Sequence, residues 1–268
     1  MTSARPLIAA FGYHEVTDEP STSGFQRPGA VPYKLTRRAF ADHLDRMAAS
    51  DRRPTRVTDV DLSQPDGRFL MLTFDDGGTS AVYAGDELCR RGWTGHFLVV
   101  SSLIGRRGFV APTDIRHLAS CGHVVGTHSH THPDIFRALA PERMLEEWRT
   151  SADMISAIVG APCTTASVPG GDISPQVLAS AARAGVRYLF TSEPRLSPQV
   201  TEGCWVLGRF SPKVGTSPAR IAELSQFRGW ASALVMRRLK ELVRAGLPTL
   251  YRHYVHRTTR ANPGTEPL

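Results

Sequence analysis

The amino-acid sequence predicts one α/β domain, in which a mostly parallel sheet either curls into a (β/α) barrel or lies open and doubly wound. Short apolar runs alternate with amphipathic segments of helical period, and parallel strands need the crossovers that helices supply. The length of 268 residues is also one that a single barrel commonly uses. In both architectures, catalytic residues gather at the carboxyl ends of the strands.

Apolar runs bounded by polar or glycine residues predict the buried strands, at 7–13, 69–74, 96–100, 124–127, 163–168, 188–191 and 205–208. Helical periodicity predicts the connecting helices, at 38–49, 81–92, 113–120, 141–159 and 175–184. The helix over 141–159 has the clearest end, because Gly160 and Pro162 follow it. Residues 17–32 are rich in Ser, Thr, Gly and Pro, which predicts a long loop over one end of the sheet.

The four cysteines form no C-x-x-C pair, so neither a zinc ribbon nor a disulfide framework is predicted. The first thirteen residues hold one arginine and a short apolar run, too brief for the core of a signal peptide. No run approaches the roughly 18 apolar residues of a spanning helix. We therefore expect a cytoplasmic protein whose only membrane role would be peripheral.

Positive charge is concentrated at the C-terminal end, where residues 205–268 hold eleven Lys or Arg against three Glu. Such a segment favours contact with an anionic lipid, a pyrophosphate-linked sugar or nucleic acid, although a solvated basic face explains it equally well. Residues 231–245 place apolar side chains on one side of a helix and basic ones on the other. That pattern suits a helix on an anionic membrane or one docked on the barrel. We expect a catalytic domain over 1–210 and a basic helical segment over 211–268 that docks on it.

Two adjacent carboxylates, Asp75 and Asp76, follow the predicted strand 69–74 and precede Gly77 and Gly78. The glycines permit a sharp turn at a strand's carboxyl end, where a catalytic pair would lie. Neighbouring carboxylates are costly unless a cation or a shared proton separates their charges, so a metal at one of them is a natural solution. The alternative is an ordinary turn with helix-capping aspartates.

Three histidines follow the strand predicted over 124–127. His128 and His132 are four residues apart, and a helical turn would place both imidazoles on one face. His130 would point elsewhere and have a structural role. Together with one carboxylate, the pair makes an Asp-His-His set with a free position for water, which is typical of a catalytic zinc site.

The run Thr73-Phe74-Asp75-Asp76-Gly77, followed by His128-Ser129-x-x-His132, resembles the first two motifs of the NodB-homology polysaccharide deacetylases, carbohydrate esterase family 4. The resemblance extends over roughly residues 8–209. It implies the distorted (β/α) barrel of that family. It also implies that Asp75 is the general base and that Asp76, His128 and His132 bind a divalent metal, most often Zn²⁺.

The third motif of that family, an Arg-Pro-Pro-aromatic-Gly run, corresponds to Ser167-Val168-Pro169-Gly170-Gly171. The resemblance implies that Pro169 preserves the framework and that Gly170 offers the N–H of the oxyanion hole. Ser167 stands where the family has the arginine that orients the base, so the sequence leaves the partner of Asp75 unidentified.

The general acid of the family has no clear counterpart here. His14 follows the first predicted strand and is our expectation for the acid, because its side chain can reach the same rim as Asp75. His253 and His256 in the basic tail are alternatives. A histidine hydrogen-bonded into the loop layer explains His14 equally well.

These residues predict metal-dependent N-deacetylation of an N-acylated amino sugar, within a glycan or on a lipid- or nucleotide-linked precursor. The partners expected are that sugar, phosphate- or lipid-linked, and a peripheral membrane contact through the basic helix, but no nucleic acid. Hydrolysis of a non-sugar amide is a variant of the same chemistry. A non-catalytic carbohydrate-binding or membrane-associated module is the alternative. The incomplete third motif and the missing fifth motif, which provides the general acid, favour it.

Overall fold

The computed structural model describes residues 6–50, 52–171 and 173–246. Its main sheet has eight strands in the order β1-β4-β5-β6-β7-β8-β10-β9. Their bounds are β1 Leu7–Tyr13, β4 Arg68–Asp76, β5 His96–Val99, β6 Val124–Thr127, β7 Thr165–Ser167, β8 Tyr188–Phe190, β9 Gln199–Thr201 and β10 Cys204–Leu207. Neighbouring strands run parallel except β9 and β10, which form an antiparallel pair.

The sheet curls until the chain that leaves β10 returns beside β1. Phe210 forms a parallel bridge with Phe11, its N–H donates to the Ala10 carbonyl at 2.9 Å, and its own carbonyl accepts from the Gly12 N–H at 2.9 Å. These bonds satisfy backbone groups that an open sheet would leave at its edge. The predicted distorted (β/α) barrel is confirmed.

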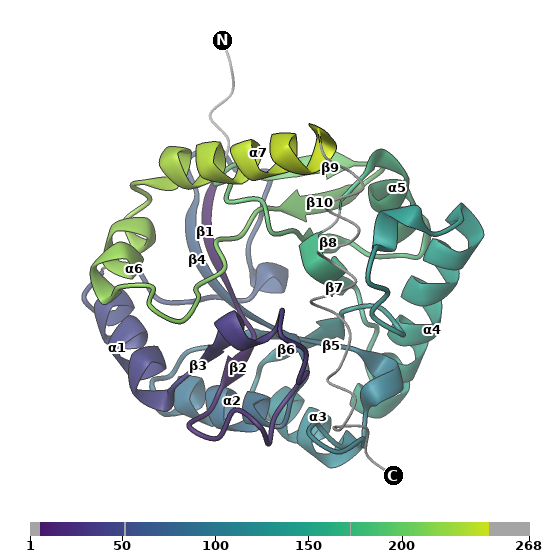
Figure 1. Ribbon diagram of the computed structural model, residues 1–268, viewed down its shortest axis with the longest axis horizontal. Helices are drawn as coiled ribbons and strands as arrows, with labels where there is room; N and C mark the ends of the chain where they lie inside the picture. The colour runs from purple at the N-terminus through teal and green to yellow at the C-terminus, as the bar shows by residue number, and fades with distance from the viewer. Residues whose placement is uncertain (1–5, 51, 172, 247–268) are drawn as a thin grey trace.

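Helices cover the outside of this curled sheet (Figure 1). They are α1 Arg37–Ala48, α2 Ser80–Arg90, α3 Pro112–Ser120, α4 Pro141–Val159, α5 Pro175–Arg183, α6 Pro218–Ser225 and α7 Trp230–Gly246. Short 3₁₀ turns lie at Val31–Tyr33, Val57–Asp59, Ser101–Leu103, Phe136–Ala138 and Pro169–Gly171. Local signals explain several ends: Ser174 caps α5 by accepting from the Val177 N–H, and Gly160 adopts the left-handed conformation that ends α4.

The sequence predicted these elements within about two residues at most ends, but missed several short ones. A second sheet pairs β2 Glu15–Val16 with β3 Lys34–Leu35, and this pair begins and ends the long loop that was predicted over 17–32. Two-residue strands are too short for a periodic signal. β9 and α6 were also missed.

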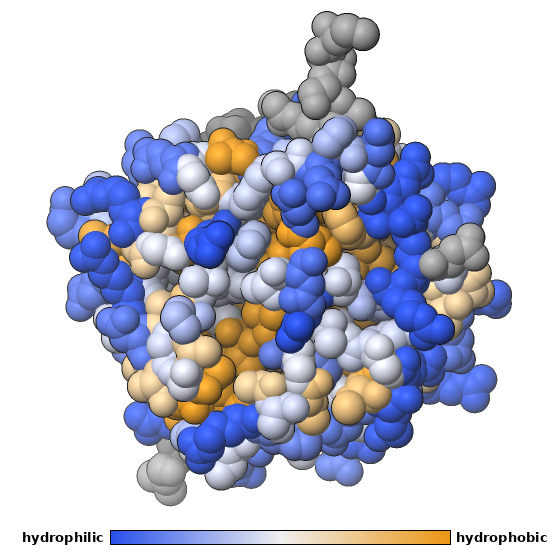
Figure 2. Space-filling model, turned by 180° about the vertical axis from the view of Figure 1, so that it is seen from behind, coloured by the Kyte–Doolittle hydropathy of each residue, from blue (hydrophilic) through white to orange (hydrophobic). Residues whose placement is uncertain are grey.

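Alternation along the strands separates side chains that face the helices from those of the barrel interior. The side chains that face the helices form two clusters, a large one and a smaller one around α4 and α5. The inward side chains of β1, β4, β5, β8 and β10 form another, which includes Ile8, Ala10, Met71, Leu98, Phe190 and Leu207. Seen from behind, the molecule has hydrophilic residues around its edge and hydrophobic ones toward the middle (Figure 2). Along β4 the inward positions change from Met71 to Thr73 and Asp75, so the barrel interior becomes polar toward the carboxyl end of the strand.

The described part of the C-terminal segment lies against the barrel. α6 packs on α1, and the buried Trp230 at the start of α7 meets the ring of Phe11 with centroids 6.0 Å apart. Val235 is 64% exposed, whereas the predicted apolar positions 239, 242 and 243 lie outside the residues whose side chains are described. Within the described ranges, no helix has the length and apolar character needed to cross a bilayer.

Candidate metal centre and catalytic pocket

The two aspartates at the carboxyl end of β4 point in different directions. Asp75 continues the inward alternation of the strand and is 4% exposed. Asp76 turns away with φ 75°, and Gly77 continues the turn with φ 79°. A Cβ on Gly77 would lie 2.8 Å from a methyl carbon of Val99, so this turn requires glycine for both its conformation and its space.

The histidine segment after β6 is an irregular turn rather than a helical one, and Pro133, which disfavours helix at His132, follows it directly. Ser129 and His132 adopt left-handed backbone conformations, with φ 67° and 55°. The Ser129 hydroxyl accepts from the His132 N–H at 3.1 Å. The buried carboxylate of Glu147 on α4 accepts from the backbone N–H groups of residues 130 and 131 at 2.9 and 2.7 Å. The segment is therefore held by side chains, which satisfy the backbone donors that a helix would have paired.

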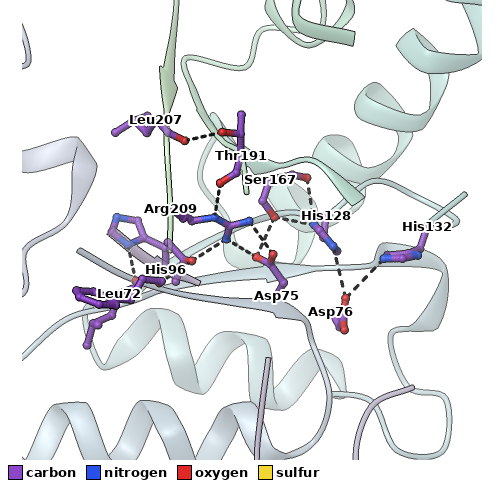
Figure 3. A network of polar contacts seen from close by, with 12 residues as sticks. Leu72, Asp75, Asp76, His96, His128, His132, Ser167, Thr191, Leu207 and Arg209 are labelled. Atoms are coloured by element: carbon purple, nitrogen blue, oxygen red, sulfur yellow. Dashed lines mark hydrogen bonds and ion pairs between the residues drawn. The ribbon is translucent and has the colours of Figure 1, made fainter. Parts of the chain in front are cut away.

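Asp76, His128 and His132 converge at this point (Figure 3). The Asp76 Oδ1 lies 3.4 Å from the His128 Nε2 and 3.7 Å from the His132 Nε2, and all three ligand atoms lie within 4.8 Å of one another. Burial, followed by the negative charges of Asp75 and Glu15, raises the pKa of Asp76 well above its usual value. A bound cation would relieve that cost, so the donor set fits a divalent metal.

Ser167 orients the first histidine ligand. The His128 Nδ1 lies 2.6 Å from the Ser167 hydroxyl and 3.1 Å from its carbonyl oxygen. Because the carbonyl can only accept, Nδ1 carries the proton, and Nε2 presents its lone pair to the candidate metal position beside Asp76. Such a bond behind a histidine ligand fixes both its ring and its tautomer.

Arg209 is the partner of Asp75 that the sequence left unidentified. Its two terminal nitrogens donate to the two carboxylate oxygens of Asp75, at 2.7 and 2.8 Å, and the two side chains are 1% and 4% exposed. The Ser167 hydroxyl donates to the same carboxylate at 3.0 Å. Although burial raises the pKa of Asp75, the Arg209 charge and the nearby His128 outweigh it, and the pKa lies well below its usual range. Asp75 is thus held ionised in a fixed orientation.

Barrel closure places Arg209 there. It follows β10 by two residues and has the same inward direction as Leu207. Its guanidinium also donates to the Thr73 hydroxyl at 2.7 Å and to the Thr191 carbonyl at 3.1 Å. A Cβ on Gly12 would lie 3.3 Å from the guanidinium carbon, so the glycine leaves room for it. The inward alternation of the last strand is the only sequence signal that could have found this arginine.

The structure places His14 and Gly170 in the lining of the same pocket as the metal residues. The His14 ring lies 4.6 Å from the Tyr33 ring, its Nδ1 is buried without a hydrogen-bond partner, and burial lowers its pKa to about 4. Gly170 has φ 61°, and Pro169 beside it is buried. Their catalytic roles remain predictions. His253 and His256 lie outside the described residues. His130 is turned to the Ser101 hydroxyl at 2.8 Å, away from the metal residues.

The pocket has a volume of about 610 Å³ and extends from the metal residues to the first turns of α7. Phe25 and Tyr33, from the loop between β2 and β3, line one side. Five cationic side chains also line it, namely Arg27, Arg209, Lys213, Arg220 and Arg237, of which Arg209 is paired with Asp75. The pocket can therefore hold a substrate much larger than an acyl group, with aromatic faces and positive charge around it.

Comparisons with known proteins agree with this arrangement. The polysaccharide deacetylase family model matches residues 63–189, which include Asp75, Asp76, His128, His132 and Ser167. An uncharacterized 30.6 kDa protein of Geobacillus stearothermophilus is 27% identical over 136 residues, and the alignment spans 49% of this chain and 49% of that protein.

Two solved structures share the fold. The Streptococcus pyogenes deacetylase PplD, in complex with acetate, matches with a TM-score of 0.68 and 17% identity, over 84% of this chain and 99% of that one. A polysaccharide deacetylase from Bacillus cereus matches with a TM-score of 0.69 and 16% identity, over 82% of this chain and 69% of that one. The resemblance to the polysaccharide deacetylases that the motifs predicted is confirmed by the family model over residues 63–189 and by the shared fold.

Proposed function

We propose that the protein is a metal-dependent N-deacetylase of an amino sugar, and that the sugar is carried on a phosphate-bearing or lipid-linked precursor. The observation that carries the proposal is the convergence of Asp76, His128 and His132 beside the ionised Asp75 in one deep pocket. We propose Zn²⁺ as the metal, because one carboxylate and two imidazoles with an open position suit catalytic zinc. A divalent metal held there would polarise the amide carbonyl and make the attacking water more acidic.

Different side chains of the protein would carry out the two proton transfers of the reaction. Asp75 accepts the proton of the attacking water, and Arg209 and Ser167 hold its carboxylate in place. Gly170 is our candidate for the N–H that stabilises the oxyanion. The leaving nitrogen then needs a proton, because expulsion of an unprotonated amine is slow.

His14 is our candidate for the group that protonates this nitrogen. With a pKa of about 4, it is neutral near pH 7, so it would take up a proton during the reaction before passing it on. A His14→Ala variant should keep its metal and lose about 10²- to 10⁴-fold in turnover. Metal content and acetate release would be measured together. Full turnover in this variant would remove His14 from the mechanism.

The cationic side of the pocket supports an anionic substrate. The Lys213 ammonium lies 4.9 Å from the centre of the Tyr33 ring, and within the described part of the chain it forms no ion pair with a carboxylate. A phosphate attached to the sugar would find this charge opposite the metal residues. The aromatic face of Tyr33 could support the sugar ring, since such rings stack on aromatic side chains.

The proposal is tested by acetate release from two substrates that carry the same N-acetylated sugar, one with a phosphate at its reducing end and one without. We expect faster release from the phosphorylated substrate, and a Lys213→Ala variant should lose this preference. Asp75→Asn should abolish release from both substrates. Tight sugar binding without any release of acetate would instead establish a non-catalytic module. The missing third-motif arginine favoured that module, but Arg209 removes this ground because it supplies the same charge to Asp75.

A further inference from the structure

A second group of metal-binding side chains lies on the outside of the barrel, between α2 and α3. Asp86 and Cys89 are three residues apart on α2, and His117 and Cys121 are four apart at the end of α3. Both spacings place the two side chains of a pair on one helix face. The ligand atoms of Asp86, His117 and Cys121 all lie within 4.8 Å of one another.

The distances in this group are close to those around a tetrahedral metal. The His117 Nε2 lies 2.8 Å from the Asp86 Oδ1 and 3.9 Å from the Cys121 Sγ. With metal–nitrogen bonds of about 2.0 Å and metal–sulfur bonds of about 2.3 Å, tetrahedral ligands would be about 3.5 Å apart. Small adjustments suffice, and the His117 and Asp86 side chains are 46% and 41% exposed, so they have room to make them.

Cys89 is placed to supply a fourth ligand. Its thiol is exposed and is near enough to interact with that of Cys121. The other two cysteines, Cys163 and Cys204, are buried in separate hydrophobic clusters and offer no competing thiol at the surface. Two thiols, one imidazole and one carboxylate form a donor set that favours Zn²⁺ over the harder cations.

We propose that Asp86, His117 and Cys121, completed by Cys89, form a second Zn²⁺ site that fastens α2 to α3. The site is separate from the candidate catalytic centre, whose ligands include no sulfur. It connects two helices that flank the catalytic strands: α2 begins four residues after Asp76, and α3 precedes β6, which leads to His128. The bound metal would therefore stabilise the walls of the site without touching the substrate.

Cobalt substitution distinguishes the two sites, because only a thiolate ligand produces an intense near-ultraviolet charge-transfer band with Co²⁺. Metal-free protein would be kept reduced with a phosphine and titrated with Co²⁺. We expect two equivalents to bind in the wild type, with the thiolate band. In the His128→Ala, His132→Ala variant, one equivalent should bind and the band should remain.

A Cys121→Ser variant should lose one equivalent of metal and most of the band, because only Cys89 is left to supply a thiolate, yet keep its acetate release. Cys89→Ser should weaken the band, whereas Ser120→Ala, which changes α3 beside Cys121 without removing a ligand, should leave it intact. Binding of a single equivalent without the band by the reduced wild type, or a band of unchanged intensity in Cys121→Ser, would overturn the second site. Neither result would bear on the candidate catalytic centre, which is assessed by acetate release.

Discussion

The candidate catalytic centre has two sides that the chain builds in different ways. The proposed metal side takes its three candidate ligands from two short runs, at the ends of β4 and β6. The base-orienting side brings Arg209, which follows β10, to Asp75 at the end of β4, 134 residues earlier in the chain. The metal side therefore depends on local motifs, and the base-orienting side depends on the closure of the whole barrel.

The difference shows that a positive charge can occupy the same position beside the base although it comes from a different place in the sequence. At the third motif, the small Ser167 hydroxyl bonds both Asp75 and His128. Instead, a guanidinium reaches Asp75 from residue 209, where the chain that leaves β10 returns beside β1. An arginine at 167 would bring a second buried positive charge beside Arg209, which burial would make costly. The departure from the motif and the presence of Arg209 are therefore linked.

Loss of the metal side should have the largest effect. A His128→Ala, His132→Ala variant removes two of the three ligands, so we expect it to lose catalytic zinc and all measurable deacetylation. His130→Ala is the matched control, because His130 lies in the same segment but bonds Ser101. Metal analysis must use a Cys121→Ser background, so that zinc on the outer helices is not counted. Full zinc occupancy in that background would contradict the assigned ligands.

Replacement of Arg209 should strongly reduce both stability and turnover but should leave the candidate metal ligands in place. Arg209→Met leaves the Asp75 carboxylate buried without its cation, and breaking such a pair costs about 3–5 kcal/mol of folding stability. We also expect a fall in turnover of about 10²-fold or more, because the base loses its orientation. Chemical denaturation and acetate release would measure both effects.

Arg209→Lys sharpens this test. Lysine keeps the charge but cannot make two parallel hydrogen bonds to a carboxylate, so it should recover more stability than turnover. If Arg209→Met denatures like the wild type and turns over at the same rate, the arginine has no role in holding the base.

The sequence predicted the features that depend on local motifs and missed those that depend on barrel closure. The strands and helices were found because their periodicity is local, and Asp75, Asp76, His128 and His132 were found because they are adjacent to strand ends. Arg209 was missed because no local spacing reveals that the chain after β10 returns beside β1, the strand that pairs with β4. Glu147 was missed because it lies outside the apolar stripe of α4, where the pattern predicts an exposed side chain. In the structure its carboxylate is 1% exposed and accepts hydrogen bonds from the histidine segment. The non-helical turn at His132 depends on these long-range contacts.

Ser167 connects the two sides, and its loss should have a smaller effect than that of either. Ser167→Ala removes the hydroxyl that bonds the His128 Nδ1 and the Asp75 carboxylate, although the backbone carbonyl at 3.1 Å still accepts from Nδ1. Loss of such a supporting bond typically weakens metal affinity about 10- to 100-fold. Competition with a metal chelator would measure the change. Ser101→Ala, which removes the partner of His130, should have no effect, and equal losses in both variants would show that Ser167 has no special role.

His96 lies in the barrel interior, and its contribution to stability should be present at neutral pH and lost in acid. Its Nδ1 donates to the Leu72 carbonyl at 2.8 Å, and its Nε2 accepts from the Val57 N–H at 2.8 Å. Only the neutral ring can make both bonds, and burial lowers the pKa of His96 to about 4 from 6.5. Between pH 6.5 and pH 4, the unfolded chain therefore binds a proton at His96 that the folded chain does not bind. The stability from this group is complete above pH 6.5 and is lost as the pH falls toward 4, by about 3 kcal/mol in total.

Denaturation of the wild type and of His96→Gln across this pH range would isolate the contribution. The variant should be less stable at pH 7, because glutamine cannot reproduce the two bonds of the ring in the same space. The gap between the two proteins should then narrow as the pH falls from 6.5 to 4, since only the wild type loses stability through this histidine. The comparison must be between the two proteins, because burial also lowers the pKa values of His14 and His43. A gap that stays constant with pH would show that His96 accepts a proton as readily in the folded chain as in the unfolded one.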